Sequence, residues 1–574
     1  MVPPAISIEI LFAFSERHSS WIGLFQLMWT QVSSSELSIL LREIEKFGLS
    51  LSPKSISLPS RPRSLIQSLP NEIWSEIFMA ASHNSNIHDS IASPIIISHV
   101  CQHWRRISLS TSALWATVLL THPSENYQLS RTVTWLMRSR RLPLHIHLDF
   151  RDPTWNWEEG SHTFGWKNME NVIRLLLPQV SRWETLKLLS DTWAPIYTFL
   201  RYTSRVQCAP RLKTIELSRC NAYFAVKGET FRPVSMKEPV SWFSGGKALA
   251  GVRRVLLAGV HVDWSHSGLS GLEELELKYH SSDVMPTLQE FTDILAASPK
   301  LRRLSILGWG PILSANDSED SLLSHPPPPS SINSYTCSIC LPYLKHFALG
   351  FIDVEYTINL LSLFCMPALE SLVLEDISRG LSHSADDLDA TPLLEYLISA
   401  HTSSVPCNSL PSHTGACTPP RCCLPLSNVS SLQIYGVLVT QGTLFHQFLQ
   451  QLPVLRYLSL SNMEEASLRS LVAQLIDSST RGPEEPAIVC PTLAELTIKH
   501  LDAPTVAGLH SLWADGDFSS LACKIILDFE DGDVSLTPGQ RASFIRAGVR
   551  LMNEPPNCPS PPCLKCAKGV ESCS

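Results

Sequence analysis

Leu272-Glu-Glu-Leu-Glu-Leu277 (LEELEL) is one copy of an L-x-x-L-x-L pattern that recurs through most of this 574-residue chain. Its alternating apolar and polar residues are typical of a strand with one buried face. Further copies begin at Leu212, Leu301, Leu344, Leu369, Val429, Leu455 and Leu493, and weaker ones at Val252 and Leu394. The starts at Leu344 and Leu369 give a period of about 25 residues. The pattern therefore predicts a row of similar short strands.

Helical patterns such as Leu288–Ala297 and Thr443–Gln451 lie between the copies. A strand with its returning helix leaves an apolar edge that only the next copy can cover, so residues 183–530 should stack as an α/β array. This part of the chain resembles an irregular leucine-rich-repeat solenoid. Cys220 occupies the place of that family's Asn/Cys ladder. In other copies the same place holds His280, Trp309, Ile352, Ile377 and Met463, so the ladder is largely missing.

A second pattern lies upstream, from Ser68 to Val118 (SLPNEIWSEIFMAASHNSNIHDSIASPIIISHVCQHWRRISLSTSALWATV). Ser68 is placed as an N-cap and Pro70 in the first turn of a helix, where its missing N–H costs nothing. Pro94 is expected to bound a second helix, whose stripe runs from Ile97 to Trp104. About 50 residues cannot enclose this much apolar surface alone, which indicates a docking module that needs a partner.

The order LP-x-EIW-x-EIF, SHVCQHWRRIS and TSALWA closely resembles the F-box, in the form common in fungal families. The resemblance implies that a helical module docks on a Skp-type adaptor, and through it on a cullin scaffold. The segment Met79–Pro94 is longer than in the shortest F-box pattern. Residues that match the motif, and are therefore expected to bind the adaptor, are Leu69, Pro70, Ile73, Ile77, Val100, Cys101, Trp104, Leu114 and Trp115. Ile77 and Trp104 are both expected to be anchors of this interface.

The predicted organisation is multidomain α+β: a small all-helical F-box followed by an irregular α/β leucine-rich-repeat solenoid. The boundaries are 1–65 for an N-terminal helical and linker segment, 66–120 for the F-box, 121–182 for a connecting α/β segment, 183–530 for the array, and 531–574 for a terminal helix and a Pro/Cys tail. Loops are expected at 314–334 and 400–427.

Composition excludes several other classes of protein. The net charge of −8, with scattered Lys and Arg, argues against nucleic acid as the main partner. No run of 18 apolar residues is present, so no membrane span is expected. Glu9 interrupts the apolar start, and a basic region is lacking, which argues against a signal peptide. The 16 cysteines are therefore interpreted as reduced thiols of a cytoplasmic or nuclear protein.

Candidate chemical groups are few. His145 and His147 share a strand face, but neither a Cys nor a carboxylate completes a metal site beside them. Two Cys-x-x-Cys pairs, at Cys337 and at Cys563, lie in biased segments where chance pairing is expected. The sequence contains no nucleophile elbow or H-E-x-x-H motif. We expect no catalytic activity, no metal and no cofactor.

The resemblance predicts a substrate-receptor subunit of an SCF-type ubiquitin ligase, with an unknown target protein bound to the repeats. An F-box scaffold that does not drive ubiquitination is the alternative, and an enzyme with a repeat-borne active site ranks far lower. The residues predicted to face outward on the sheet are Thr214, Glu216, Glu274, Glu276, Arg303, Ser305, His346, Ala348, Tyr457 and Ser459. Target binding is assigned to Glu274, Glu276, Arg303 and Tyr457, partly through charge.

Overall fold

The computed structural model describes residues 69–83, 86–123, 126–220, 225–313, 339–378, 389–402, 424–439, 441–480, 490–514, 523–529 and 534–553. The chain divides into two units, Met1–Ile73 and Trp74–Ser574, and nearly all the described residues belong to the second. Several predicted features lie outside the described residues: the N-cap Ser68, the loop 314–334, most of 400–427, Cys337 and the Pro/Cys tail.

The segment that resembles the F-box forms three helices and a short 3-10 turn: α4 (Asn71–Ser82), α5 (Ile87–Val100), α6 (Gln102–Ser110) and η2 (Ser112–Trp115). The prediction of one helix bounded by Pro94 and continuing to Trp104 is wrong. Pro94 lies inside α5, which ends at Val100. Cys101 is extended, with φ −156° and ψ 169°, and its Sγ accepts a hydrogen bond from the Trp104 N–H at 3.4 Å. Cys101 therefore caps a separate helix.

The dominant element of the second unit is a 14-stranded sheet in which every neighbouring pair is parallel. Its strands, in spatial order, are β1 (Thr117–Thr121), β2 (Leu144–Asp149), β3 (Trp183–Ser190), β4 (Thr214–Arg219), β5 (Arg254–Ala258), β6 (Glu274–Lys278), β7 (Arg303–Leu307), β9 (His346–Phe351), β11 (Ser371–Asp376), β12 (Ser431–Tyr435), β13 (Tyr457–Ser461), β14 (Glu495–Lys499), β15 (Lys524–Asp528) and β16 (Arg550–Met552). The pair β8 (Ile339–Cys340) and β10 (Phe364–Cys365) forms a separate small sheet.

The L-x-x-L-x-L copies coincide with strands of this sheet, and their apolar positions are buried. In the copy that begins at Leu272, Leu272, Leu275 and Leu277 are each 1% exposed. The weak copy expected at Leu394 is wrong, because Leu394 lies in a helix, α13 (Thr391–Thr402). Leu393, Leu394 and Leu397 are buried there with helical rather than strand spacing.

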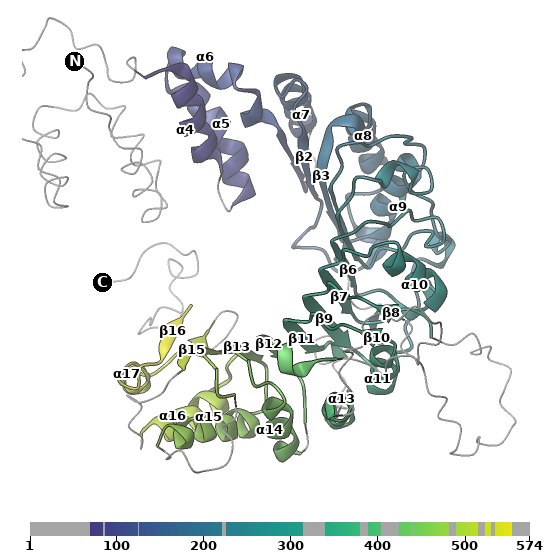
Figure 1. Ribbon diagram of the computed structural model, residues 1–574. Helices are drawn as coiled ribbons and strands as arrows, with labels where there is room; N and C mark the ends of the chain where they lie inside the picture. Colours follow the sequence, from purple (N-terminus) through teal and green to yellow (C-terminus); the bar gives the residue numbers. More distant parts are fainter. Residues whose placement is uncertain are drawn as a thin grey trace, which may run out of the picture. The chain divides into compact units, whose positions relative to one another are not determined.

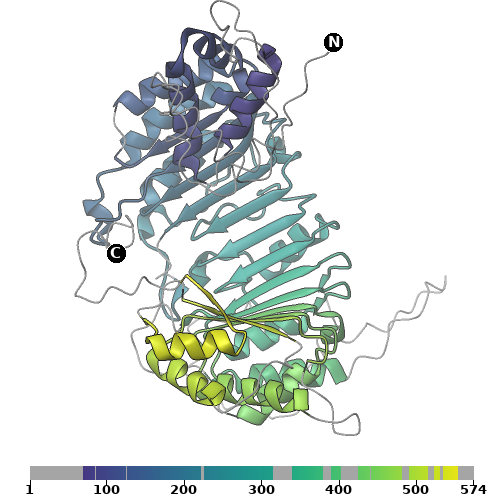
Figure 2. The same ribbon diagram turned by 90° about the vertical axis from the view of Figure 1, so that its left-hand side faces the viewer.

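The helices that connect the strands lie on one side of the sheet, and among the described residues the other side of β4 to β15 carries no helix (Figures 1 and 2). Their bounds are α7 (Asn126–Arg138), α8 (Trp166–Leu176), α9 (Trp193–Thr203), α10 (Leu288–Ala296), α11 (Val354–Ser362), α14 (Gly442–Gln450), α15 (Glu465–Thr480), α16 (Ala503–Ala514) and α17 (Pro538–Arg546). The fold is therefore mixed α/β around a large parallel sheet that does not close on itself.

A left-handed residue follows many of the strands and turns the chain out of the sheet. Gly259 (φ 59°) follows β5, and Gly308 (φ 102°) follows β7. Non-glycine residues at the same place are Tyr279, Asn462 and His500. At the C-terminal end, the terminal helix expected within 531–574 is α17, but it ends at Arg546, Gly548 adopts φ 78°, and the strand β16 follows, which the sequence did not predict.

The segment 225–240, which follows β4, runs along the carboxyl ends of later strands. The Lys227 ammonium pairs with the Asp353 carboxylate at the start of α11. The Phe231 N–H donates to Asp283, whose carboxylate also lies 2.8 Å from the Lys237 ammonium. Buried side chains gather beside this segment as one apolar cluster, made of Ala225, Leu307, Ile352 and Ile377. The carboxyl side of β7 and β9 is thus occupied by the chain itself.

Within the described residues no helix combines the length and the apolar character needed to cross a membrane.

Candidate interaction surfaces

Three aromatic rings fill the interior between α4 and α6. The Trp74 and Trp104 ring centroids are 4.9 Å apart, and Phe78 lies 5.0 Å from Trp104. Trp104 is 3% exposed and Phe78 is 1% exposed. Trp104, expected as an anchor for the adaptor, is therefore placed inside the chain, where it supports the helices that carry other residues.

Leu114 and Trp115, also predicted to bind the adaptor, are buried too. The Trp115 indole N–H donates to the Ser108 carbonyl at 2.8 Å, and its ring meets Trp135 edge-on at 4.8 Å. The Arg138 guanidinium lies 4.4 Å from the centre of the Trp115 ring. These contacts satisfy both the ring and its polar atom, so Trp115 has an internal structural role.

The remaining predicted adaptor residues reach the surface to different degrees. Leu69 is 40% exposed, Ile73 is 38% exposed, and Pro70 beside them is exposed as well. Ile77, one turn after Ile73 on α4, is half-buried, as are Val100 and Cys101. Helix α4 thus turns Trp74 and Phe78 inward and presents Ile73 outward, as the four-residue spacing requires.

Sequence reasoning missed one exposed apolar side chain in this segment, Ile96 of α5, which is 45% exposed. It was missed because Pro94 was interpreted as a helix boundary, which left the face of α5 undefined. The run Ile95-Ile96-Ile97 is itself a signal, since three consecutive apolar residues on a helix cannot all point to one side.

The helix-free face of the sheet carries rows of side chains fixed by the strand register (Figure 2). One row runs through Thr214, Arg254, Glu274, Arg303, His346, Ser371, Ser431, Tyr457 and Glu495. These residues are exposed or half-buried, as predicted for outward positions. Ser305 in the next row is the exception, because it is 5% exposed. Its register neighbour Ala348 packs against the apolar cluster of Leu307 and Ile377.

The two carboxylates assigned to target binding already have cationic partners. Glu274 receives two hydrogen bonds from Arg254, at 2.6 and 2.9 Å, which hold its pKa below its usual range. Glu276 lies 2.6 Å from the Lys278 ammonium. The expected acidic portion of this surface is therefore compensated by its neighbours, which weakens the charge argument for Glu274 and Glu276.

Arg303 and Tyr457, the other two assigned residues, are exposed. Arg303 makes no ion pair with any residue that the structure describes, and Tyr457 is 54% exposed. Beside Arg303, burial lowers the pKa of His346 and the arginine charge lowers it further. His346 is therefore neutral at pH 7, and it adds no charge to this part of the face.

The other chemical candidates bring no reactive constellation together. His145 and His147 lie on β2 facing β3, where His145 is 3.1 Å from the Thr185 hydroxyl. Burial lowers the pKa of His147. Cys340 is exposed on β8. Among the described residues, no group of three or more His, Cys, Asp or Glu is placed to hold a metal ion.

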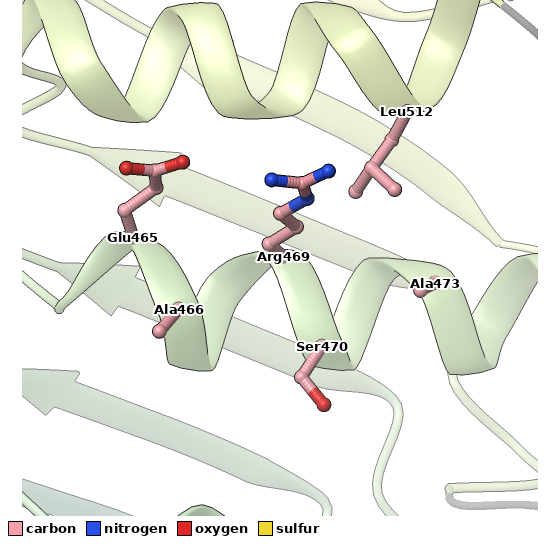
Figure 3. A pocket seen from close by; sticks show the side chains of 6 residues that line it. All are labelled: Glu465, Ala466, Arg469, Ser470, Ala473 and Leu512. Atoms are coloured by element: carbon pink, nitrogen blue, oxygen red, sulfur yellow. The ribbon is translucent and has the colours of Figure 1, made fainter.

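A shallow hollow lies between α15 and α16 and is lined by Glu465, Ala466, Arg469, Ser470, Ala473 and Leu512 (Figure 3). Glu465, Arg469 and Leu512 lie between the two helices in this view. A Cβ on Gly508 would meet the Glu465 carboxylate at 2.2 Å, so the glycine allows this close approach. The residues that line the hollow do not include an acid–base pair arranged for catalysis. We interpret it as a groove between two packed helices.

Comparison with known proteins adds no relative: no protein-family model matches the chain, and no curated protein matches it.

Proposed function

We propose that this chain is the substrate-receptor subunit of an SCF-type ubiquitin ligase. In this proposal the segment from Leu69 to Trp115 is an F-box that docks on a Skp-type adaptor, which in turn joins a cullin scaffold. The sheet and its helices are a leucine-rich-repeat solenoid that holds a target protein. The chain itself performs no chemistry, and it acts in the cytoplasm or nucleus.

The observation that carries the docking proposal is that α4 and the residues just before it have buried aromatic side chains and exposed aliphatic ones. Trp74 and Phe78 pack against Trp104 in the interior, whereas Leu69, Pro70 and Ile73 remain exposed. Covering an aliphatic side chain of this size contributes roughly 1.5–3 kcal/mol when it is fully buried. Exposed aliphatic residues beside a complete aromatic core are what a docking surface needs. They also stand at positions that match the motif.

The repeat proposal is supported by the buried leucines of successive parallel strands and by the left-handed residues that follow many of them. A parallel array with helices on one side leaves a broad face on which another protein can lie.

The proposed mechanism is proximity. A receptor that holds both the adaptor and a target raises the local concentration of the target's lysines near a charged conjugating enzyme. The test is affinity capture of the full-length chain with a Skp-type adaptor, followed by measurement of the half-lives of captured partners. Failure to capture the adaptor would overturn the proposal. Adaptor capture with unchanged half-lives of all other partners would favour an F-box scaffold instead.

A further inference from the structure

The helix-free face has one stretch with more cations than carboxylates. Along the amino-terminal side of β5 to β13, neighbouring charges pair where they can: Arg254 with Glu274, and Lys345 with Glu370 at 2.7 Å. On β3 and β4, Lys187 pairs with Glu216 at 3.0 Å. These pairs leave little net charge along much of the face.

Three guanidinium groups on this face are not neutralised by such ion pairs. Arg302, Arg303 and Arg456 are exposed, and none forms an ion pair with a described residue. The Arg302 backbone N–H donates to the Glu273 carbonyl, but the Glu273 carboxylate lies 3.9 Å from Arg253 and is half-exposed. The surplus positive charge therefore lies at the amino-terminal ends of β7 and β13, in a chain whose net charge is −8.

In the row of Arg303 the intervening residues are hydroxyls and an imidazole, whereas the row of Arg302 and Arg456 also holds the mutually paired Lys345 and Glu370. The register places His346, Ser371, Ser431 and Tyr457 in the same row as Arg303. Burial and Arg303 lower the pKa of His346, so it carries no charge at pH 7. We call Arg302, Arg303, His346, Arg456 and Tyr457 the basic strip. It offers hydrogen-bond donors to an anion along its whole length.

We infer that the basic strip binds an extended peptide segment rich in Asp and Glu on the target protein. This inference rests on the proposed receptor function and names the class of target for the same face. Four strand spacings of about 4.8 Å separate Arg303 from Tyr457, or roughly 19 Å. An extended peptide of about six residues covers that distance. A carboxylate at each end would then meet Arg303 and Arg456, the two exposed cations that flank the row.

The test is fluorescence anisotropy of the full-length chain with a labelled peptide of alternating Glu and Ser, beside the same peptide with Gln and with Lys in place of Glu. The Glu peptide is expected to bind at least tenfold more tightly than the Gln peptide at low salt, and the Lys peptide should not bind. Raising the ionic strength to about 0.3 M should weaken the complex, since exposed charges are screened beyond a Debye length.

Arg303→Gln together with Arg456→Gln should weaken Glu-peptide binding at least tenfold. The matched control is Arg201→Gln together with Arg205→Gln, which removes two exposed arginines outside the strip and changes the net charge equally. Equal loss in both double variants, or equal binding of the Glu and Gln peptides, would overturn the inference. A tenfold preference for a phosphoserine peptide of equal charge would overturn its carboxylate chemistry.

Adaptor capture is measured on the same preparations. Adaptor capture without Glu-peptide preference would overturn this inference and leave the receptor proposal standing. Glu-peptide binding without adaptor capture would support the anion-binding strip and overturn the receptor function on which the target assignment rests.

Discussion

Arg254 grips the carboxylate of Glu274 through two parallel hydrogen bonds, Nε to Oε2 at 2.6 Å and Nη2 to Oε1 at 2.9 Å. The pair joins β5 to β6, and it lies directly beside Arg303 in the strand register. Arg254 thus neutralises the Glu274 carboxylate, which would otherwise be free to pair with Arg303. The basic strip that contains Arg303 keeps its positive charge because Glu274 is already paired with Arg254.

Opening that pair should weaken binding of an acidic peptide. Arg254→Gln frees the Glu274 carboxylate to repel the ligand, and two unit charges about 7 Å apart in water interact by about 0.6 kcal/mol, or nearly threefold in affinity. Adding Glu274→Gln should restore the wild-type affinity, because the repelling charge is then removed. Anisotropy with the Glu peptide checks both. An unchanged affinity in Arg254→Gln would show that Glu274 does not influence the strip.

Binding of the acidic peptide should strengthen as pH falls from 8 to 6. In the free chain, burial, Arg303 and Lys345 lower the pKa of His346, while Glu370 and Glu274 raise it. A bound anion stabilises the imidazolium, so the complex takes up a proton and lower pH favours it. His346→Gln should flatten the profile. Wild-type affinity that does not change with pH would contradict a role for His346.

Acid should destabilise the array through two core histidines. His261 and His280 are 2% and 1% exposed, and burial lowers the pKa of each to about 4. Each binds protons more tightly when unfolded, so stability falls as pH drops from about 6.5 to about 4, by roughly 1.4 kcal/mol per pH unit per histidine.

Thermal unfolding across that pH range should show the loss, and His280→Gln should remove part of its slope. The matched control is His88→Gln, which replaces an exposed histidine. Equal pH slopes in the wild type and in His280→Gln would contradict the assignment to His280.

Truncating the aromatic core of the helical segment should unfold it locally. Trp104→Ala removes a ring packed against Trp74 and Phe78, and large-to-small changes of this kind cost about 3–5 kcal/mol. Amide hydrogen exchange of α4 to α6 should accelerate, with the sheet strands unaffected. Ile73→Ala, at an exposed position, should change stability by about 0.5 kcal/mol or less. Protected α4 amides in Trp104→Ala would place Trp104 outside the core.

The strands of the sheet could be predicted because the L-x-x-L-x-L spacing puts leucines on a single buried face, as at Leu275 and Leu277. The copy at Leu394 failed because short apolar runs do not distinguish a buried helix from a strand. Pro94 misled for a related reason: proline usually ends a helix, but here it is tolerated inside α5.

The surfaces were only partly predictable from the sequence. Pattern matching selected Leu69 and Trp104 alike, yet one is exposed and the other is buried, and only packing separates them. Likewise Glu274 and Glu276 looked like a free acidic patch. The partner of Glu274, Arg254, lies on the adjacent strand, and ion pairing across the register is not visible in one strand's sequence. Lys278 follows Glu276 by two residues on the same strand, so that pair was within reach of the alternation pattern.

The most direct test of the account is adaptor capture by a surface variant that leaves the core intact. Leu69→Glu together with Ile73→Glu places charges on the exposed aliphatic positions, and Ile545→Glu on α17, at 59% exposure, is the matched control. Losing two anchors worth about 2 kcal/mol each should weaken binding of a purified Skp-type adaptor about a thousandfold, with an unchanged melting temperature. Wild-type affinity in the double variant, measured by titration calorimetry, would contradict docking through this surface.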